Sequence, residues 1–298
     1  MPDTRVAAIV GPTAVGKTEV SVQVAERLDA EIVSVDSMQV YRGLDIGTAK
    51  VDAATRRRVP HHLIDIRPPD VDVTVAEFQR LARAAIADIH GRGWLPLLVG
   101  GSGLYLRAVV DDLRFPARSP RVRAALEAEA DDVGAESLHA RLAALDPAAA
   151  ARIEPGNARR TVRALEVIEV TGRPFSDNTS WEEHRSIYDL RVAGLSLDRP
   201  RLYDAIAGRV DTMLEQGLVD EARKLAPHIG RTARQALGYR QILDHPDADE
   251  ADVRDAIVRA TKRFARRQES WFRSDPRVVW FDASNLALQE QLVAYLTA

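Results

Sequence analysis

Short apolar runs alternate with amphipathic stretches over the first third of the chain. Apolar runs of strand length, rich in β-branched residues, occupy 6–10, 31–35 and 95–99. Between them, apolar positions recur every three or four residues across 19–28 and 75–90, the period of a helix with one buried face. Strands that alternate with such helices are typical of a parallel sheet. The pattern therefore predicts an α/β fold with a doubly wound parallel sheet.

The hydrophobic pattern changes near residue 115. From 120 to about 171 the periodicity is entirely helical and alanine is abundant, without a strand-like run, and a strand pattern returns at 190–197. We therefore predict an α/β core formed by 1–114 and 188–298, interrupted by an all-helical insertion domain at 115–187. The last elements that the pattern predicts are helices over most of 200–273, a strand at 278–281 and a helix at 286–295.

The loop between the first strand and the first helix matches the P-loop motif G-x-x-x-x-G-K-S/T. Backbone N–H groups of such a loop and the N-terminus of the next helix point at one spot, which favours a phosphate chain. Lys17 adds a positive charge, and the Thr18 hydroxyl is the usual Mg²⁺ ligand of the motif. We predict that the loop binds a di- or triphosphate with Mg²⁺. Its residues are Gly11, Pro12, Thr13, Ala14, Val15, Gly16, Lys17 and Thr18.

The second strand leads into a polar cluster, Asp36-Ser37-Met38-Gln39, at the edge where parallel sheets bind ligands. A motor-type NTPase would carry a carboxylate after the run at 95–99, but Gly100 and Gly101 stand there, and no N-K-x-D guanine-reading element is present. The residues therefore indicate group transfer from a phosphorylated donor, with Asp36 facing the acceptor. They leave open whether the group is phosphoryl or another, and whether Asp36 only caps its own turn.

Composition narrows the class of protein. The chain of 298 residues contains no cysteine, which excludes disulfides, thiolate catalysis and cysteine-ligated zinc. It has no run of eighteen apolar residues and no charged-then-apolar leader, so we expect a cytoplasmic protein without a membrane partner. No feature indicates a protein partner, and we expect a monomer. The formal net charge of −3 argues against a uniformly basic nucleic-acid binder.

Two basic clusters nevertheless stand out. The stretch 254–273 carries seven basic and two acidic residues, and on a helix Arg259, Arg263 and either Arg266 or Arg267 fall on one face. A second cluster lies in the predicted insertion and consists of Arg152, Arg159, Arg160 and Arg163. Basic surfaces on two parts of an acidic chain predict an extended polyanion as partner.

These motifs together resemble those of the tRNA dimethylallyltransferases, the tRNA isopentenyltransferase family. The resemblance spans most of the chain in the family's order, whereas a generic P-loop kinase shares the P-loop alone. Besides the P-loop, the matching stretches are 36–41, 45–50, 60–65, 98–105, 157–165 and 238–240.

The resemblance implies a reaction and the residues for it. The family transfers a dimethylallyl group from dimethylallyl diphosphate to the exocyclic N6 amine of an adenosine. That adenosine lies immediately 3′ of the anticodon in tRNAs that read codons beginning with U. By position, the implied catalytic residues are Asp36, Thr13 and Arg209, with the P-loop on the diphosphate and Mg²⁺ near Thr18. The residues implied to contact the anticodon stem-loop of tRNA are Asp36, Ser37, Met38, Gln39, Ser102, Arg123, Arg159, Arg160, Thr161, Val162, Arg163 and Arg240.

Two other functions compete with the one that the resemblance implies. A small-molecule or nucleoside kinase would use the same loop for ATP and Asp36 as base, but it leaves the basic clusters without a role. A non-enzymatic, ATP-dependent RNA-binding module leaves Asp36 unexplained. Label transfer from a prenyl donor or from ATP would separate these functions.

Overall fold

The computed structural model describes residues 4–177 and 183–298. It divides into two compact units, which we describe separately. The core unit comprises Met1–Asp111 and Ser186–Ala298, and the helical unit comprises Asp112–Arg185. The sequence pattern predicts an insertion at 115–187, of which 178–182 lie outside the described residues.

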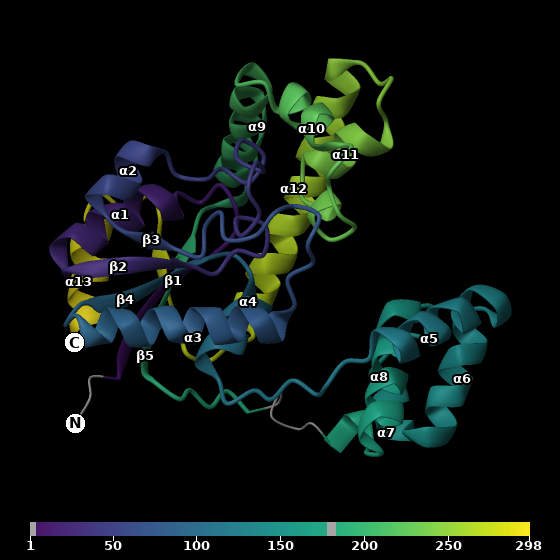
Figure 1. Ribbon diagram of the computed structural model, residues 1–298. Coiled ribbons are helices and arrows are strands. Elements are labelled where there is room, and N and C mark those ends of the chain that lie inside the picture. Colours follow the sequence, from purple (N-terminus) through teal and green to yellow (C-terminus); the bar gives the residue numbers. More distant parts are fainter. Residues whose placement is uncertain (1–3, 178–182) are drawn as a thin grey trace. The chain divides into compact units, whose positions relative to one another are not determined.

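A six-stranded sheet forms the centre of the core unit (Figure 1). Its order is β3-β2-β4-β1-β5-β6 and every neighbouring pair is parallel, as the alternating pattern predicts. In the register of the central strands, Ile9 lies between Val99 and Ala193. The strands are β1 (Arg5–Val10), β2 (Ala30–Ser34), β3 (His61–His62), β4 (Leu95–Gly100), β5 (Asp189–Ser196) and β6 (Val278–Asp282).

Helices cover both faces of this sheet. The chain moves from β1 to β2 in one direction across the sheet and from β3 to β4 in the other. Because such crossovers are right-handed, the connecting helices α1 and α3 lie on opposite faces, which confirms the doubly wound fold. The helices of the core unit are α1 (Lys17–Arg27), α2 (Ala53–Arg58), α3 (Val75–Gly91), α4 (Gly103–Val110), α9 (Arg199–Glu215), α10 (Leu218–Leu225), α11 (Tyr239–Asp244), α12 (Glu250–Arg273) and α13 (Leu288–Thr297).

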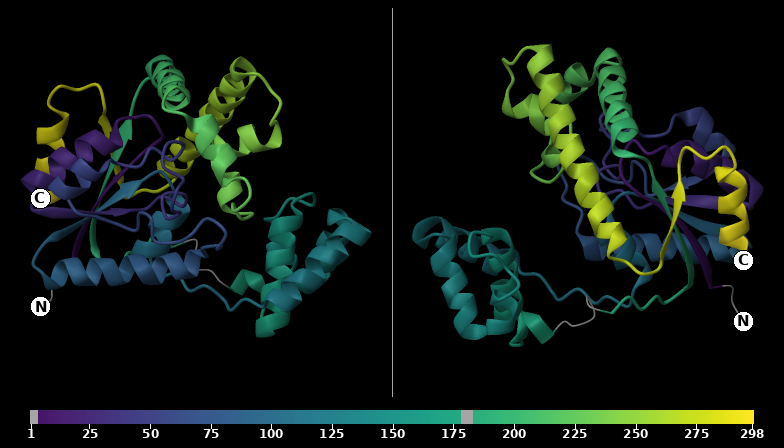
Figure 2. Two further views of the ribbon diagram at one scale, coloured as in Figure 1. Left: turned by 45° about the horizontal axis from the view of Figure 1, so that its top comes forward. Right: turned by 180° about the vertical axis from the view of Figure 1, so that it is seen from behind.

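Burial on both faces explains the uninterrupted apolar strands. Every residue of β1 after Arg5 is buried, and all five residues of β2 are buried. On one side α1 packs against α13, and on the other α3 packs against α4. The long helix α12 runs beside α9, and α10 and α11 pack against these two helices (Figures 1 and 2).

The helical unit has a small apolar core of its own. Helix α8 packs against both α5 and α6, and leucines such as Leu126, Leu138, Leu142 and Leu165 are buried between them. Within its described residues the unit contains helices and no strand, as predicted. Its helices are α5 (Pro120–Val133), α6 (Ala135–Leu145), α7 (Pro147–Ala150) and α8 (Ala158–Thr171).

The chain leaves the core unit and returns to it through neighbouring residues. An antiparallel bridge joins Asp111 to Ser186, and the Ile187 N–H donates to the Val110 carbonyl at 2.8 Å. The Asp111 carboxylate is buried and accepts from Arg107 Nε at 2.6 Å and from the guanidinium of Arg277. This ion cluster fixes the exit point of the chain within the core unit.

Candidate active site at the carboxyl edge of the sheet

The P-loop connects β1 to α1 at the carboxyl edge of the sheet. Gly11 has a φ of +143°, and a Cβ there would lie 2.6 Å from the Leu195 carbonyl oxygen, so no larger residue fits. Gly16 is the N-cap of α1 and supplies no capping side chain. The first N–H groups of α1 therefore lack a side-chain cap, and the helix N-terminus favours an anion there.

Two cations face this loop without a carboxylate partner. Lys17 Nζ donates to the carbonyls of Gly11 at 2.9 Å and Pro12 at 2.7 Å. Arg209 Nη1 reaches over from α9 and donates to Thr13 Oγ1 at 3.1 Å. Neither Lys17 nor Arg209 forms an ion pair with any residue in the described part of the chain. The site therefore has positive charge that a phosphate chain would neutralise.

Removal from water weakens the hold of Lys17 on its proton. Burial and then the nearby charge of Arg209 lower the pKa of Lys17 to about 7, and Asp36 opposes this shift. Burial likewise lowers the pKa of Arg209, although a guanidinium stays charged at any physiological pH. An anion bound between the two groups would favour the charged form of Lys17 and raise its pKa.

We expect this site to bind inorganic diphosphate more weakly as the pH rises above about 7. The charged form of Lys17 is then lost from the free protein, whose Lys17 pKa is about 7, but is retained with the anion bound. Linkage gives a loss of up to about tenfold per pH unit in that window and no loss below it. Calorimetric titration from pH 6 to 9 measures this dependence. Lys17→Arg is the control, because its charge is permanent and any remaining dependence belongs to diphosphate itself. Identical profiles for the two proteins would contradict the expectation.

Asp36 follows β2 and has one oxygen engaged and one open. Its Oδ1 accepts from the Met38 N–H at 2.8 Å, so the carboxylate caps its own turn. Its Oδ2 accepts no hydrogen bond from the described residues. The turn-capping role thus coexists with an oxygen that is available to a substrate.

Two cavities meet at these residues. The smaller one, about 330 Å³, follows the P-loop and extends over the ends of β2 and β4. The larger one, about 850 Å³, extends toward α11 and α12. The residues that line both are Thr13, Asp36, Thr48, Gly101, Arg209, Phe264 and Gln268. Asp36, Thr13 and Arg209, the predicted catalytic set, therefore lie at the junction of the two cavities.

The larger cavity collects most of the RNA-contact residues predicted in the core unit. Ser37, Met38, Ser102 and Arg240 all line it. Ser102 is the N-cap residue of α4, but its side chain makes no capping hydrogen bond. Arg240 is exposed and pairs with Asp244 at 3.3 Å.

One face of α12 completes this cavity. Arg259, Arg263 and Arg267 line it, which decides between Arg267 and Arg266 for the predicted basic face. Trp271 and Gln268 lie on the same helix and line the same cavity. Sequence reasoning found the arginines from their helical spacing but gave no sign of Gln268, because a single glutamine in a polar helix has no distinguishing pattern.

Gln39 has a structural role in addition to the RNA contact predicted for it. Its Oε1 accepts from Ser34 Oγ at 2.8 Å and its Nε2 donates to the Thr48 carbonyl at 3.1 Å. It lines the smaller cavity and is absent from the lining of the larger one. Its side chain therefore ties the loop at 45–50 to the end of β2, and its contact with an RNA base stays a prediction.

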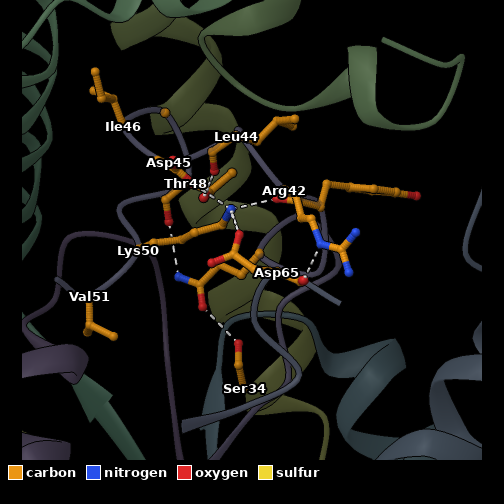
Figure 3. Close-up of polar contacts among 12 residues, drawn as sticks. Ser34, Arg42, Leu44, Asp45, Ile46, Thr48, Lys50, Val51 and Asp65 are labelled. Carbon is orange, nitrogen blue, oxygen red and sulfur yellow. Dashed lines mark hydrogen bonds and ion pairs between the residues drawn. The ribbon is translucent and has the colours of Figure 1, made fainter. Parts of the chain in front are cut away.

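The loop at 45–50 is held by the buried side chain of Lys50 and by the hydroxyl of Tyr239. The Lys50 side chain is only 2 % exposed, and its Nζ donates to the carboxylates of Asp45 at 2.7 Å and Asp65 at 2.5 Å (Figure 3). The hydroxyl of Tyr239 accepts from the Gly47 N–H at 3.1 Å, and a Cβ on Gly47 would lie 2.4 Å from the Tyr239 ring. Two stretches that carry the family resemblance, 45–50 and 238–240, thus contact each other.

In the helical unit, the predicted RNA-contact residues differ in accessibility. Arg159 and Arg160 are exposed, but Thr161 and Val162 are 0 % and 2 % exposed and lie on the buried face of α8. In this stretch the side chains of Arg159, Arg160 and Arg163 are the accessible ones, and the RNA contact of 159–163 stays a prediction.

Arg163 and Arg123 meet at a buried carboxylate. Both donate to Glu166 Oε2, at 2.8 Å and 3.4 Å, and Arg163 also donates to the Pro116 carbonyl at 2.9 Å. Burial and the charges of Arg163 and Arg123 lower the pKa of Arg118 nearby. Arg123 also donates to Glu127 at 3.0 Å, so two carboxylates face three guanidinium groups and this part of the helical unit keeps excess positive charge.

The donor groups near the P-loop suit a weakly protein-bound cation. Among the described residues, no group of three or more His, Asp or Glu side chains could hold a metal ion. Thr18 is exposed and lines the smaller cavity. A cation held mainly by phosphate oxygens and water, with one hydroxyl from the protein, fits the preference of Mg²⁺.

Among the described residues, no helix has both the length and the apolar character that a membrane span requires.

Comparison with known proteins gives consistent similarities. The family model described as IPP transferase matches residues 39–275. The tRNA dimethylallyltransferase of Acidothermus cellulolyticus is 54% identical over 292 residues, which are 96% of this chain and 91% of the relative. The tRNA dimethylallyltransferase of Streptomyces avermitilis is 53% identical over 294 residues, 97% of this chain and 94% of the relative.

Solved structures are similar over nearly the whole chain. The full-length tRNA isopentenylpyrophosphate transferase of Bacillus halodurans superposes with a TM-score of 0.72 at 44% identity, covering 99% of this chain and 95% of that one. A eukaryotic dimethylallyltransferase, captured acting on tRNA, gives a TM-score of 0.83 at 25% identity and covers 98% of this chain and 77% of that one.

Proposed function

The chain belongs to the IPP transferase family of prenyl-transferring enzymes, and we propose that it is a tRNA dimethylallyltransferase. In this proposal it transfers a dimethylallyl group from dimethylallyl diphosphate to the N6 amine of an adenosine. The adenosine is the one 3′-adjacent to the anticodon in tRNAs that read U-starting codons. The comparisons give no support to the kinase alternative.

The observation that carries the proposal is the junction of the two cavities at Thr13, Asp36 and Arg209. The smaller cavity has the P-loop amides and two cations without a carboxylate partner among the described residues, which suits the diphosphate of a donor. The larger cavity has the arginines of α12 and room for a base with its flanking phosphates. A donor and an acceptor that enter from the two cavities would meet where the open oxygen of Asp36 lies.

The chemistry follows from the charges at the junction. In the transfer, the bond from the prenyl carbon to the diphosphate oxygen breaks and a bond from that carbon to the adenine nitrogen forms. Lys17, Arg209 and the loop amides stabilise the negative charge that grows on the departing diphosphate. An adenine amine is a weak nucleophile, and Asp36 Oδ2 would accept its proton as the new bond forms. Mg²⁺ beside Thr18 would, when bound, neutralise further charge on the diphosphate.

The acceptor base has to leave its stack to reach this junction. An adenine in an anticodon loop is already unpaired, so its extrusion costs less than extrusion from a duplex. Ser37, Met38, Ser102 and Arg240 line the larger cavity and would contact the base and its neighbours. The exposed arginines of the helical unit would bind phosphates of the anticodon stem-loop.

Label transfer tests the proposed function directly. The purified chain is incubated with an unmodified tRNA that reads a U-starting codon, Mg²⁺ and either ¹⁴C-labelled dimethylallyl diphosphate or γ-³²P-labelled ATP. We expect label in RNA only from the prenyl donor, and digestion to nucleosides should place it on one adenosine. The same tRNA with guanosine at that position is the matched control. Label from ATP, or prenylation of the guanosine variant, would contradict the proposal.

Removal of Arg159 and Arg160 together should weaken tRNA binding and its dependence on salt. Each phosphate that the protein no longer neutralises lowers the log–log salt slope by about one unit, so the double Ala variant should lose up to about two. Filter binding at several salt concentrations measures the slope. Arg141→Ala is the control within the same unit, because Glu129 and Glu169 already pair with Arg141 at 2.6 Å each. A slope unchanged from that of the parent chain would assign Arg159 and Arg160 to an ordinary solvated face.

A further inference from the structure

Gln268 connects two loops of the site through both ends of its side-chain amide. Its Oε1 accepts the Thr13 N–H at 2.9 Å, and its Nε2 donates to the Gly101 carbonyl at 2.9 Å. The side chain extends from α12 and the residue is buried, with 7 % exposed. Gln268 therefore joins the P-loop to the loop after β4.

The surroundings of Gln268 fit an amide closely. A Cβ on Gly101 would lie 2.1 Å from Gln268 Nε2, so the bridge requires glycine at 101. A primary amide offers a donor and an acceptor side by side, and both are matched here by backbone groups. An apolar side chain of equal size would leave a buried N–H and a buried carbonyl without partners, and such groups are costly.

The bridge acts on Thr13, whose hydroxyl accepts a hydrogen bond from Arg209. Thr13 accepts from Arg209 Nη1 through its hydroxyl and donates to Gln268 through its backbone. Its N–H is thus committed to Gln268, which sets the orientation of the first turn of the P-loop. Gln268 also lines both cavities at their junction. A shift of this side chain would move the diphosphate-facing loop and the wall of the acceptor cavity together.

We propose that Gln268 is a positioning residue for the transfer reaction. It holds the Thr13 and Gly101 loops in the arrangement that aligns the donor's reacting carbon with the acceptor amine. This inference rests on the proposed function and adds to it a residue that makes no bond to either reacting atom.

The first test replaces Gln268 by Met, which keeps the side chain's length but cannot bridge the loops. At saturating substrates we expect the single-turnover rate of prenyl transfer to fall by about ten- to thirtyfold, because small misplacements of reacting groups are expensive. The Kd for tRNA should stay within about twofold of the parent value. Gln289→Met is the matched control, since Gln289 on α13 also donates to a backbone carbonyl, at 3.4 Å, away from the site. A parent-like rate in folded Gln268→Met would overturn the proposal.

The second test uses pH to separate alignment from packing. In Gln268→Glu the protonated carboxyl has a donor and an acceptor like the amide, whereas the ionised carboxylate can only accept and repels the Gly101 carbonyl. The rate relative to the parent chain at the same pH should therefore approach one at low pH and fall as the new carboxyl ionises. Taking the ratio at each pH cancels the pH effects that the two proteins share. A ratio that does not change with pH would mean that Gln268 only fills space.

Failure of the proposed function would be distinguishable from failure of this inference. If the parent chain transfers no prenyl group, the proposed function fails, and the affinity for inorganic diphosphate still tests Gln268. Calorimetry should then give a Kd about three- to tenfold weaker for Gln268→Met than for the parent and Gln289→Met, because the P-loop has lost its anchor. Equal affinities would overturn the positioning role.

Discussion

Replacing Asp36 with Asn is expected to slow single-turnover transfer by about 10²- to 10⁴-fold, the usual range for loss of a general base. Asn keeps the size of the side chain, and its amide oxygen can still accept the Met38 N–H that Asp36 Oδ1 accepts at 2.8 Å. What it loses is the second carboxylate oxygen, which has no partner among the described residues. Binding of the donor and of tRNA should change much less than the rate.

Asp52→Asn is the matched control for that substitution. Asp52 also caps a turn, since its carboxylate accepts the Thr55 N–H at 2.7 Å at the start of α2, but it does not line either cavity. The same chemical change there should leave the rate unaltered. If the Asp36 variant retains a rate within a few-fold of the parent, Asp36 only caps its turn or positions the base, and the amine proton leaves by another route.

Lys17→Ala should lower the transfer rate by about 10²- to 10³-fold and strongly weaken donor binding, as loss of one preorganised charge does at other active sites. The remaining cation, Arg209, approaches the loop from α9 and contacts the hydroxyl of Thr13 rather than the Gly11 and Pro12 carbonyls. It cannot take the place of Lys17. Affinity for tRNA should be nearly unchanged, because Lys17 lines only the smaller cavity.

Folding of the Lys17 variant is not expected to suffer. Because burial lowers the pKa of Lys17 to about 7 from an ordinary value of 10.5, its protonation opposes folding at any pH below 10.5. Removal of the side chain therefore leaves the melting temperature equal or higher. Lys224→Ala, on the exposed face of α10, provides the comparison. If a well-folded Lys17→Ala protein lost as much affinity for tRNA as for the donor, the assignment of the P-loop to the donor would be contradicted.

The sequence predicts this fold well where periodicity is long and burial complete. The five longer strands and the helices α1, α3 and α13 begin and end within a few residues of the predicted ranges. Strand β3 escapes prediction because its two residues are too few to show a period. It exists through pairing with β2, in which Ile32 lies opposite His61, and that pairing is a property of the tertiary fold.

The residues of the site likewise divide into those that have a local sequence signal and those that have none. The P-loop and Asp36 are local signals, readable from a strand end and the loop that follows. Gln268 and Tyr239 are not, because each acts on a residue more than a hundred positions away, Thr13 and Gly47 respectively. A motif also does not show which of its residues are accessible. Thr161 and Val162 belong to a matching stretch, yet they lie on the buried face of α8.

The chain leaves the core unit and re-enters it at neighbouring residues, and this has an evolutionary consequence. The helical unit begins and ends at residues joined by a backbone hydrogen bond, from the Asp112 N–H to the Arg185 carbonyl at 3.2 Å. To the core unit it is a single closed loop, and the entropy of closing a loop grows only logarithmically with its length. Insertions, deletions or replacement of helices within 112–185 therefore leave the core sheet and its P-loop intact. Changes in the helical unit and in the core unit that carries the P-loop are thus open to separate selection.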